Sequence, residues 1–250
     1  MTAAPTASLP ETRQSRTQSS VVASALTLFS GQLAIKVVAF VFSVVVIRHL
    51  GSAEYGKYAI CVAFGGLFTV LSDLGLATLA VKRIARDQRE TPDMFSNVLA
   101  LRLVLASLVV VATSLTAWIV GYDPEIRLGI LIASFGLLAY ALHGSIDAVV
   151  MGHERFRFSA SLAVATQVVT LALAAALVFG GAGFLGLLIA ATLGALLVAL
   201  VALWRLRRVV PLRGPVTPSS WGGMTRAAMP FAATTLALAV SYRVDAVILS

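Results

Sequence analysis

The chain has 250 residues, of which 59% are hydrophobic and 12% are charged. Soluble domains carry about 25% charged residues, so this composition excludes an ordinary soluble domain. The net charge of +8 would by itself suit a nucleic-acid-binding protein. The basic residues are, however, spread over alternate connections between apolar stretches, and we therefore expect the lipid bilayer, and no nucleic acid, as the environment of this protein.

Residues 1–20 are polar and include Pro5 and Pro10, which predicts a disordered tail. Apolar stretches of about 20 residues follow, the length at which a helix crosses a hydrocarbon core of about 30 Å. Six are complete and a seventh continues to the last residue: Val21–Ile47, Tyr55–Val81, Phe95–Gly121, Leu128–Val150, Ala160–Phe179, Phe184–Trp204 and Ala227–Ser250. The sequence therefore predicts an all-α, polytopic transmembrane helix bundle.

This pattern divides the chain into four parts. A tail (1–20) precedes a six-helix lobe (21–204), a linker (205–226) and the first helix of a second lobe (227–250). The linker begins with four residues, RLRR, that favour an anionic membrane surface, and its three prolines then interrupt any helix. Because the seventh stretch stops in mid-span, we expect the sequence to be a piece of a longer protein.

The connections between the stretches alternate in charge. Thirteen basic residues lie in the tail and in the second-to-third, fourth-to-fifth and sixth-to-seventh connections, against three in the other connections. Basic residues accumulate on the cytoplasmic side of membranes. The sequence therefore predicts a multi-pass protein of the cytoplasmic membrane with a cytoplasmic N-terminus. All three outer turns are short, as in the four residues at 180–183.

Two cations lie near the middle of predicted spans. Lys36 is about 22 Å and Arg243 about 24 Å from the cytoplasmic end of its span. Charges at this depth are costly and face a partner or a wet cavity. Both are therefore candidate substrate-binding residues for a phosphate or pyrophosphate, unless an acid elsewhere neutralises them. Asp245, a candidate structural or coupling charge, is about 200° from Arg243 around the helix and faces elsewhere.

Three further charges lie closer to the cytoplasmic side. Asp73 and Arg102 are each about 11 Å deep on consecutive, oppositely directed spans. This equal depth favours a structural ion pair, although Arg102 is also a candidate substrate contact on the entry side. Asp147 is expected either to reach the interface or to cap the turn formed by residues 152–155.

Signals of an enzyme are weak in this sequence. His49, His143 and His153 are isolated, without the spacing of a metal site. There is no P-loop and no recognisable nucleophile motif. We therefore predict a non-enzyme without a metal or other cofactor.

Several segments together carry a resemblance to a known family. The stretch HLGSAEYGKYAICVAFGGLFTVLSDLGL (His49–Leu76) resembles the first outer turn and second helix of polysaccharide and oligosaccharide flippases, O-antigen type, which belong to the multidrug/oligosaccharidyl-lipid/polysaccharide exporter superfamily. Gly152–Phe156 is similar to the fourth-to-fifth inner turn of that family, and Tyr242–Leu249 is similar to the opening of its seventh helix. The resemblance covers nearly the whole chain.

The resemblance implies two six-helix lobes around a central cavity that alternates between the two membrane faces. It further implies translocation of a glycan carried on polyprenyl pyrophosphate, as a step in polysaccharide biosynthesis, with glycan polymerase or export proteins as possible partners. Lys36 and Arg243 would then lie at equivalent positions of the two lobes. The alternatives are a multidrug or small-molecule antiporter of the same superfamily, a membrane glycan polymerase or ligase, and a scaffold without transport activity.

Overall fold

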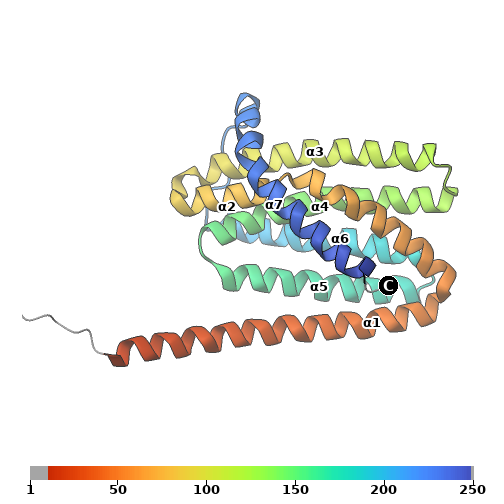
Figure 1. Ribbon diagram of the computed structural model, residues 1–250, viewed down its shortest axis with the longest axis horizontal. Coiled ribbons are helices and arrows are strands. Elements are labelled where there is room, and N and C mark those ends of the chain that lie inside the picture. The colour runs from red at the N-terminus through yellow and green to blue at the C-terminus, as the bar shows by residue number, and fades with distance from the viewer. Residues whose placement is uncertain (1–10, 249–250) are drawn as a thin grey trace, which may run out of the picture. The chain divides into compact units, whose positions relative to one another are not determined.

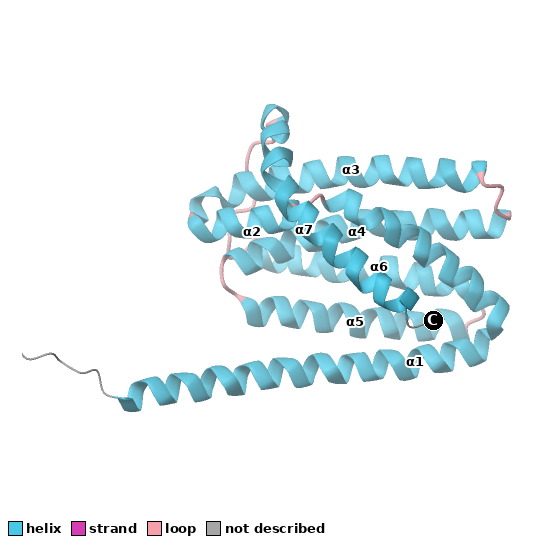
Figure 2. Cartoon of the chain, in the orientation of Figure 1, coloured by secondary structure: helices cyan, strands magenta, loops and turns pink. Residues whose placement is uncertain are grey.

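The computed structural model describes the backbone of residues 11–248 and the side chains of residues 36–234 apart from 67, 70 and 71. The described residues are helical, without strands, which confirms the all-α prediction (Figure 2). The helices are α1 (Glu11–Asp73), α2 (Leu76–Arg86), η1 (Gln88–Glu90), α3 (Thr91–Ile119), α4 (Pro124–Gly152), α5 (Phe156–Phe179), α6 (Gly183–Leu206), η2 (Pro218–Ser220) and α7 (Trp221–Ile248). The chain forms two compact units, 1–43 and 44–250, and the second unit includes α2 to α7.

The first outer turn is shorter than the sequence predicts. The sequence places a connection at residues 48–54, but helical structure continues through them except at Gly51, where φ is 80° and ψ is 167°. Glycine takes up this conformation without strain because it lacks a Cβ atom. One residue is therefore enough to change the direction of the chain.

The second predicted span, Tyr55–Val81, does not form a single helix. It is broken at Leu74 and Gly75, whose φ angles are 46° and 73°. A Cβ atom built on Gly75 would lie 2.7 Å from the backbone nitrogen of Ala232 and 2.8 Å from the backbone oxygen of Ala228. The break therefore exposes a stretch of backbone without a side chain, on which α7 packs.

Helices α3 to α6 form the central part of the second unit. They lie roughly horizontally in Figure 1 and run in alternating directions, and α4 packs against both α3 and α6, while α5 packs against α6. Large apolar side chains of α3 and α6 remain exposed, among them Leu108, Val111, Leu115, Val201 and Trp204. An exposed apolar face of this kind is typical of helices that contact lipid.

Within the part of the chain that the structure describes, five helical segments are long and apolar enough to cross a membrane. They are Lys36–Gly66, Gln88–Ile119, Pro124–Gly152, Phe156–Phe179 and Gly183–Leu206. The predicted spans 21–47 and 227–250 lie partly outside the residues with described side chains.

The segment between α6 and α7 is attached to the helix bundle. Val210 and Leu212 are buried in the same apolar cluster as Phe95 and Val98 of α3. The side chain of Asn97 accepts a hydrogen bond from the backbone nitrogen of Thr217 at 2.8 Å. The linker therefore lies against the beginning of α3, and its division from the preceding lobe at residue 205 stays a prediction.

Candidate substrate cavity

Arg102 is the largest fully buried side chain among the described residues, with 1% of its surface exposed. It lies on α3 and extends toward Gly144 of α4. A Cβ atom at Gly144 would lie 2.8 Å from both terminal nitrogens of the guanidinium. The guanidinium therefore packs directly against the α4 backbone at Gly144, and a larger residue there would require it to shift.

Asp73 lies beside this cation at the end of α1. Its Oδ1 atom is 3.1 Å from Nε of Arg102. The same oxygen accepts a hydrogen bond of 3.3 Å from the backbone nitrogen of Ala77, in the first turn of α2. The helix break thus brings the carboxylate to an arginine and to the free N–H groups of a helix N-terminus, both of which stabilise negative charge. The structure brings together the two residues that the sequence places at equal depth.

The ion pair leaves part of the guanidinium without a directed partner. Nη1 of Arg102 donates a hydrogen bond of 3.3 Å to Oγ of Ser145. Nε has no hydrogen-bond partner, because its N–H direction does not meet Asp73 despite the short distance. Arg102 is thus neutralised by charge but incompletely satisfied by hydrogen bonds, a state that is rare for a buried polar group.

Both residues line a cavity of about 390 Å³, here termed the polar cavity because Thr78, Tyr140 and Asp147 also line it, although most of its surface is apolar. Asp147 accepts a hydrogen bond from Oγ of Ser159, at the beginning of α5. The N–H groups of the turn at residues 153–155 bond to backbone carbonyls, so Asp147 does not cap this turn, whereas the expectation that it reaches the interface stays a prediction. Its position follows from α4, because Tyr140, Gly144, Asp147 and Met151 recur every three or four residues on one helix face.

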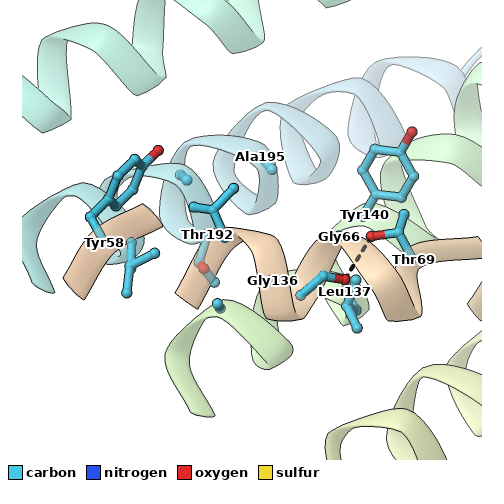
Figure 3. A pocket seen from close by; sticks show the side chains of 13 residues that line it. Tyr58, Gly66, Thr69, Gly136, Leu137, Tyr140, Thr192 and Ala195 are labelled. Atoms are coloured by element: carbon cyan, nitrogen blue, oxygen red, sulfur yellow. Dashed lines mark hydrogen bonds between the residues drawn. The ribbon is translucent and has the colours of Figure 1, made fainter. Parts of the chain in front are cut away.

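A second, more apolar cavity of about 440 Å³ adjoins the polar cavity and shares Thr69 and Tyr140 with it. Figure 3 shows Tyr58 toward one end of this apolar cavity and Thr69 with Tyr140 toward the other. Its walls come from α1, α4 and α6 and are formed largely by small residues: Gly65, Gly66, Ala133, Gly136, Ala191 and Ala195. The two cavities together provide an apolar surface with charged groups at one end.

The remaining predicted site residues are not brought to this cavity by any described contact. Lys36 is exposed on α1 and belongs to the first unit. The side chains of Arg243 and Asp245 lie outside the described residues. Their predicted roles therefore stay predictions.

Sequence reasoning missed three residues of the site: Tyr140, Ser145 and Thr69. A signal for the first two was present, because α4 carries its polar residues on adjacent stripes that include Asp147. Thr69 left no such signal. Among the residues whose side chains the structure describes, no three or more potential metal ligands gather into a group.

Two solved structures are similar to this chain in fold. One is described as the crystal structure of MATE in complex with MaD3S, with 16% sequence identity and a TM-score of 0.59, covering 84% of this chain and 52% of that one. The other is a MOP superfamily transporter from Pyrococcus furiosus, with 15% identity and a TM-score of 0.59, covering 87% of this chain and 52% of that one. The chain thus spans about half the length of these proteins.

No curated protein matched the chain. The family comparison gave a match over almost all of it, including the helix break and both cavities. The matching model is described as polysaccharide biosynthesis protein and covers residues 21–250, and the chain therefore belongs to this family of multi-pass membrane proteins.

Proposed function

We propose that the full protein is a flippase, which moves a glycan on polyprenyl pyrophosphate from the cytoplasmic to the outer leaflet. The observation that carries this proposal is the buried, incompletely satisfied Arg102 at the charged end of an otherwise apolar cavity. A lipid-linked pyrophosphate has the same division into a charged group and an apolar chain. Family membership supports a role in polysaccharide biosynthesis.

The proposal gives the cations different roles. Lys36 and Arg243 bind the pyrophosphate near the middle of the membrane, where a charge costs at least about 2.5 kcal/mol without a partner. Arg102, nearer the cytoplasmic end, contacts the substrate on entry and is otherwise neutralised by Asp73. No covalent step is required, so the protein acts as a transporter and not as an enzyme.

The proposed orientation places the N-terminus in the cytoplasm. The α2–α3, α4–α5 and α6–α7 connections lie at one end of the second unit, and most of its basic residues lie in them or in the adjoining helix turns. The turns at Gly51, Gly121 and Gly181 lie at the other end (Figure 1). This asymmetry supports a cytoplasmic location for the basic end.

Alternating access would follow from movement of this lobe against a second one. The chain covers 52% of each of the two similar structures, which is consistent with one lobe and the beginning of the next. Sites between structural repeats are common in transporters.

The test is a flipping assay on the full-length protein in liposomes, with a fluorescent polyprenyl-pyrophosphate glycan. We expect Lys36→Ala and Arg243→Ala each to reduce transport strongly, whereas Lys57→Ala, which removes a cation at the outer end, serves as the matched control. Wild-type transport in both substrate-site variants would reject the assignment. No flipping by the wild-type protein would reject the function itself.

One observation favours an antiporter as the second candidate. Asp147 and Asp73 both line the polar cavity, and antiporters use cavity carboxylates to couple to cations. An imposed sodium or proton gradient would distinguish the two. An antiporter would move a small molecule across the membrane in exchange for the sodium ions or protons, and Asp147→Asn would abolish that exchange. Neither result is expected of the proposed flippase.

A further inference from the structure

A separate cavity of about 490 Å³ lies between the beginning of α3 and the segment that follows α6. It shares no lining residue with the two cavities of the candidate site. Leu99, Ala100 and Leu103 form its apolar wall on α3, and Val216 adds to this wall from the linker. Its remaining wall includes two cations, Arg207 and Arg213.

The linker wall is held in a defined position. The backbone nitrogen of Gly214 donates a hydrogen bond of 3.0 Å to Oγ of Ser96, which in turn donates to the carbonyl oxygen of Leu212 at 3.3 Å. Leu212 is buried, and a Cβ atom at Gly214 would lie 2.5 Å from the carbonyl carbon of Pro92. The cavity is therefore a built groove rather than the gap beside a loose loop.

The two arginines of the groove differ from their neighbour Arg208. The guanidinium of Arg208 stacks on the ring of Trp204, 3.7 Å from its centre. Arg207 and Arg213 are exposed and make no ion pair or side-chain hydrogen bond within the part of the chain that the structure describes. Two unpaired cations thus line a groove whose α3 wall is apolar.

The groove lies where a segment long and apolar enough to span a membrane meets a basic connection, which is the position expected of a site between a lipid headgroup and its acyl chains. Its α3 wall belongs to this segment. Arg207 follows directly after α6, another such segment, and Arg213 lies further along the linker. From Phe95 to Leu103 the wall is about 12 Å long, enough for the upper part of an acyl chain. Trp204 with Arg208 is a pairing typical of the membrane interface.

We propose that this groove binds an anionic glycerophospholipid of the surrounding leaflet. Arg207 and Arg213 contact the headgroup phosphate, and the apolar wall of α3 contacts an acyl chain. In a zwitterionic lipid an ammonium group offsets the phosphate charge, which would weaken its attraction to two cations that have no acidic partner. An anionic lipid brings none, so the groove selects for net negative charge. This site is independent of the proposed transport cavity.

The experiment measures lipid binding to the purified full-length protein in neutral detergent, from the rise in melting temperature on titration with short-chain lipids. Phosphatidylglycerol is the probe, and phosphatidylcholine and inorganic phosphate are the comparison ligands. We expect phosphatidylglycerol to stabilise the protein at concentrations at which neither comparison ligand does. Equal stabilisation by phosphatidylcholine or by inorganic phosphate would overturn the proposal.

Two variants locate the effect. Arg207→Gln with Arg213→Gln should weaken phosphatidylglycerol binding about tenfold or more, because each basic residue contributes a comparable share of the attraction. The matched control, Arg155→Gln with Arg157→Gln, removes two exposed cations from the same end of the bundle outside the groove. It should leave the affinity within about twofold of wild type. Similar losses in both double variants would mean diffuse surface attraction and reject the groove.

A third variant tests the apolar wall. Ala100→Trp fills the groove without changing charge, and we expect it to weaken binding of phosphatidylglycerol. The melting temperature without lipid reports whether the variant is folded. A folded variant with unchanged phosphatidylglycerol affinity would reject the acyl-chain contact and, with it, the proposed lipid site.

Discussion

Two buried polar side chains of α3, Asn97 and Arg102, are five residues apart and differ in how their polar atoms are satisfied. At about 100° per residue they point about 140° apart around the helix. Asn97 faces the linker after α6, and Arg102 faces the polar cavity. Both are nearly inaccessible, with exposed fractions of 3% and 1%.

The difference between them is how fully their polar atoms are satisfied. The amide nitrogen of Asn97 donates to the carbonyl oxygens of Asp93 and Pro215, each at 2.9 Å. Its oxygen accepts from the backbone of Thr217 and, at 3.2 Å, from the indole nitrogen of Trp221. Arg102 has a charge partner, but its Nε has no hydrogen bond. A complete neutral network is suited to holding a segment in place, whereas an incomplete charged one is suited to exchanging partners.

Replacement of Arg102 should have the largest effect. Arg102→Ala leaves Asp73 without its counter-charge and opens a void beside Gly144. We expect a loss of about 3 kcal/mol in the free energy of unfolding, near the lower end for a broken buried ion pair because the Asp73 side chain is 25% exposed. Thermal unfolding in detergent measures this loss.

The double variant Asp73→Leu with Arg102→Met separates stability from transport. Apolar replacement of both charges should restore most of the stability. If Arg102 exchanges its partner for substrate, the double variant will fold and still transport poorly. A stable double variant with wild-type flipping would make the pair purely structural and end the contrast with Asn97.

Gly75 links the Asp73–Arg102 pair to α7, because it lies two residues after Asp73 and packs against α7, the helix that begins at Trp221. Gly75→Ala adds a Cβ atom within 3 Å of α7 backbone at a φ of 73°. We expect a loss of about 2–3 kcal/mol from backbone strain and overpacking, measured by thermal unfolding.

Gly51→Ala is the matched control for this prediction. Its φ is 80°, but no atom lies within 4 Å of the added Cβ. It should therefore cost only the strain of about 1 kcal/mol. Equal losses in both variants would mean that the contact with α7 contributes nothing.

Asn97→Ala should cost less than Arg102→Ala or Gly75→Ala. It removes neutral hydrogen bonds and leaves buried groups of the linker unpaired, a loss of about 1–2 kcal/mol. The effect specific to this variant is release of the linker, which would be detected as faster tryptic cleavage after Arg207, Arg208 and Arg213. Ser107→Ala is the control, because that exposed side chain bonds only to the carbonyl of Leu103 in its own helix. Unchanged linker cleavage in Asn97→Ala would remove the structural role assigned to Asn97.

The arrangement of spans was predictable because hydrophobic length is read directly from sequence, and the family resemblance was confirmed by the match over residues 21–250. The helix break at Leu74 and Gly75 was not predicted. Its cause is tertiary, since α7 packs on Gly75 from more than 150 residues away along the chain. A single glycine in an apolar stretch does not reveal such a contact.

The site was predictable only in part for a similar reason. Equal depth in the membrane predicts that Asp73 and Arg102 pair, and the structure has them 3.1 Å apart. Depth does not give the direction around a helix, so the expectation that Asp147 caps the turn at residues 152–155 was wrong, and Asp147 instead bonds to Ser159. Asn97 carried no signal, because its partners lie in a linker whose path depends on the packed bundle.

A third contact at the basic end, His153 with Thr91, sharpens the comparison through its pH dependence. Oγ1 of Thr91 donates to the carbonyl of Gln88, so it accepts from Nε2–H of His153, 3.1 Å away. This hydrogen bond survives protonation of the ring. Burial, and then the charge of Arg155, nevertheless lower the pKa of His153 below its usual value of 6.5. The unfolded chain therefore binds the proton more readily, and stability should fall as pH decreases below about 6.5.

We expect this to be the smallest of the four effects, less than about 1 kcal/mol between pH 7 and pH 5, because solvent screens a partly exposed group. His153→Gln keeps a donor for Thr91 but does not titrate, so its thermal stability should vary less with pH over this interval. Thr91→Val removes the acceptor and leaves the imidazole, and it should keep a pH dependence. If His153→Gln retained the full wild-type dependence, the titrating group would lie elsewhere. The stability of the basic end of the bundle would then come from neutral contacts such as those of Asn97, without a contribution from His153.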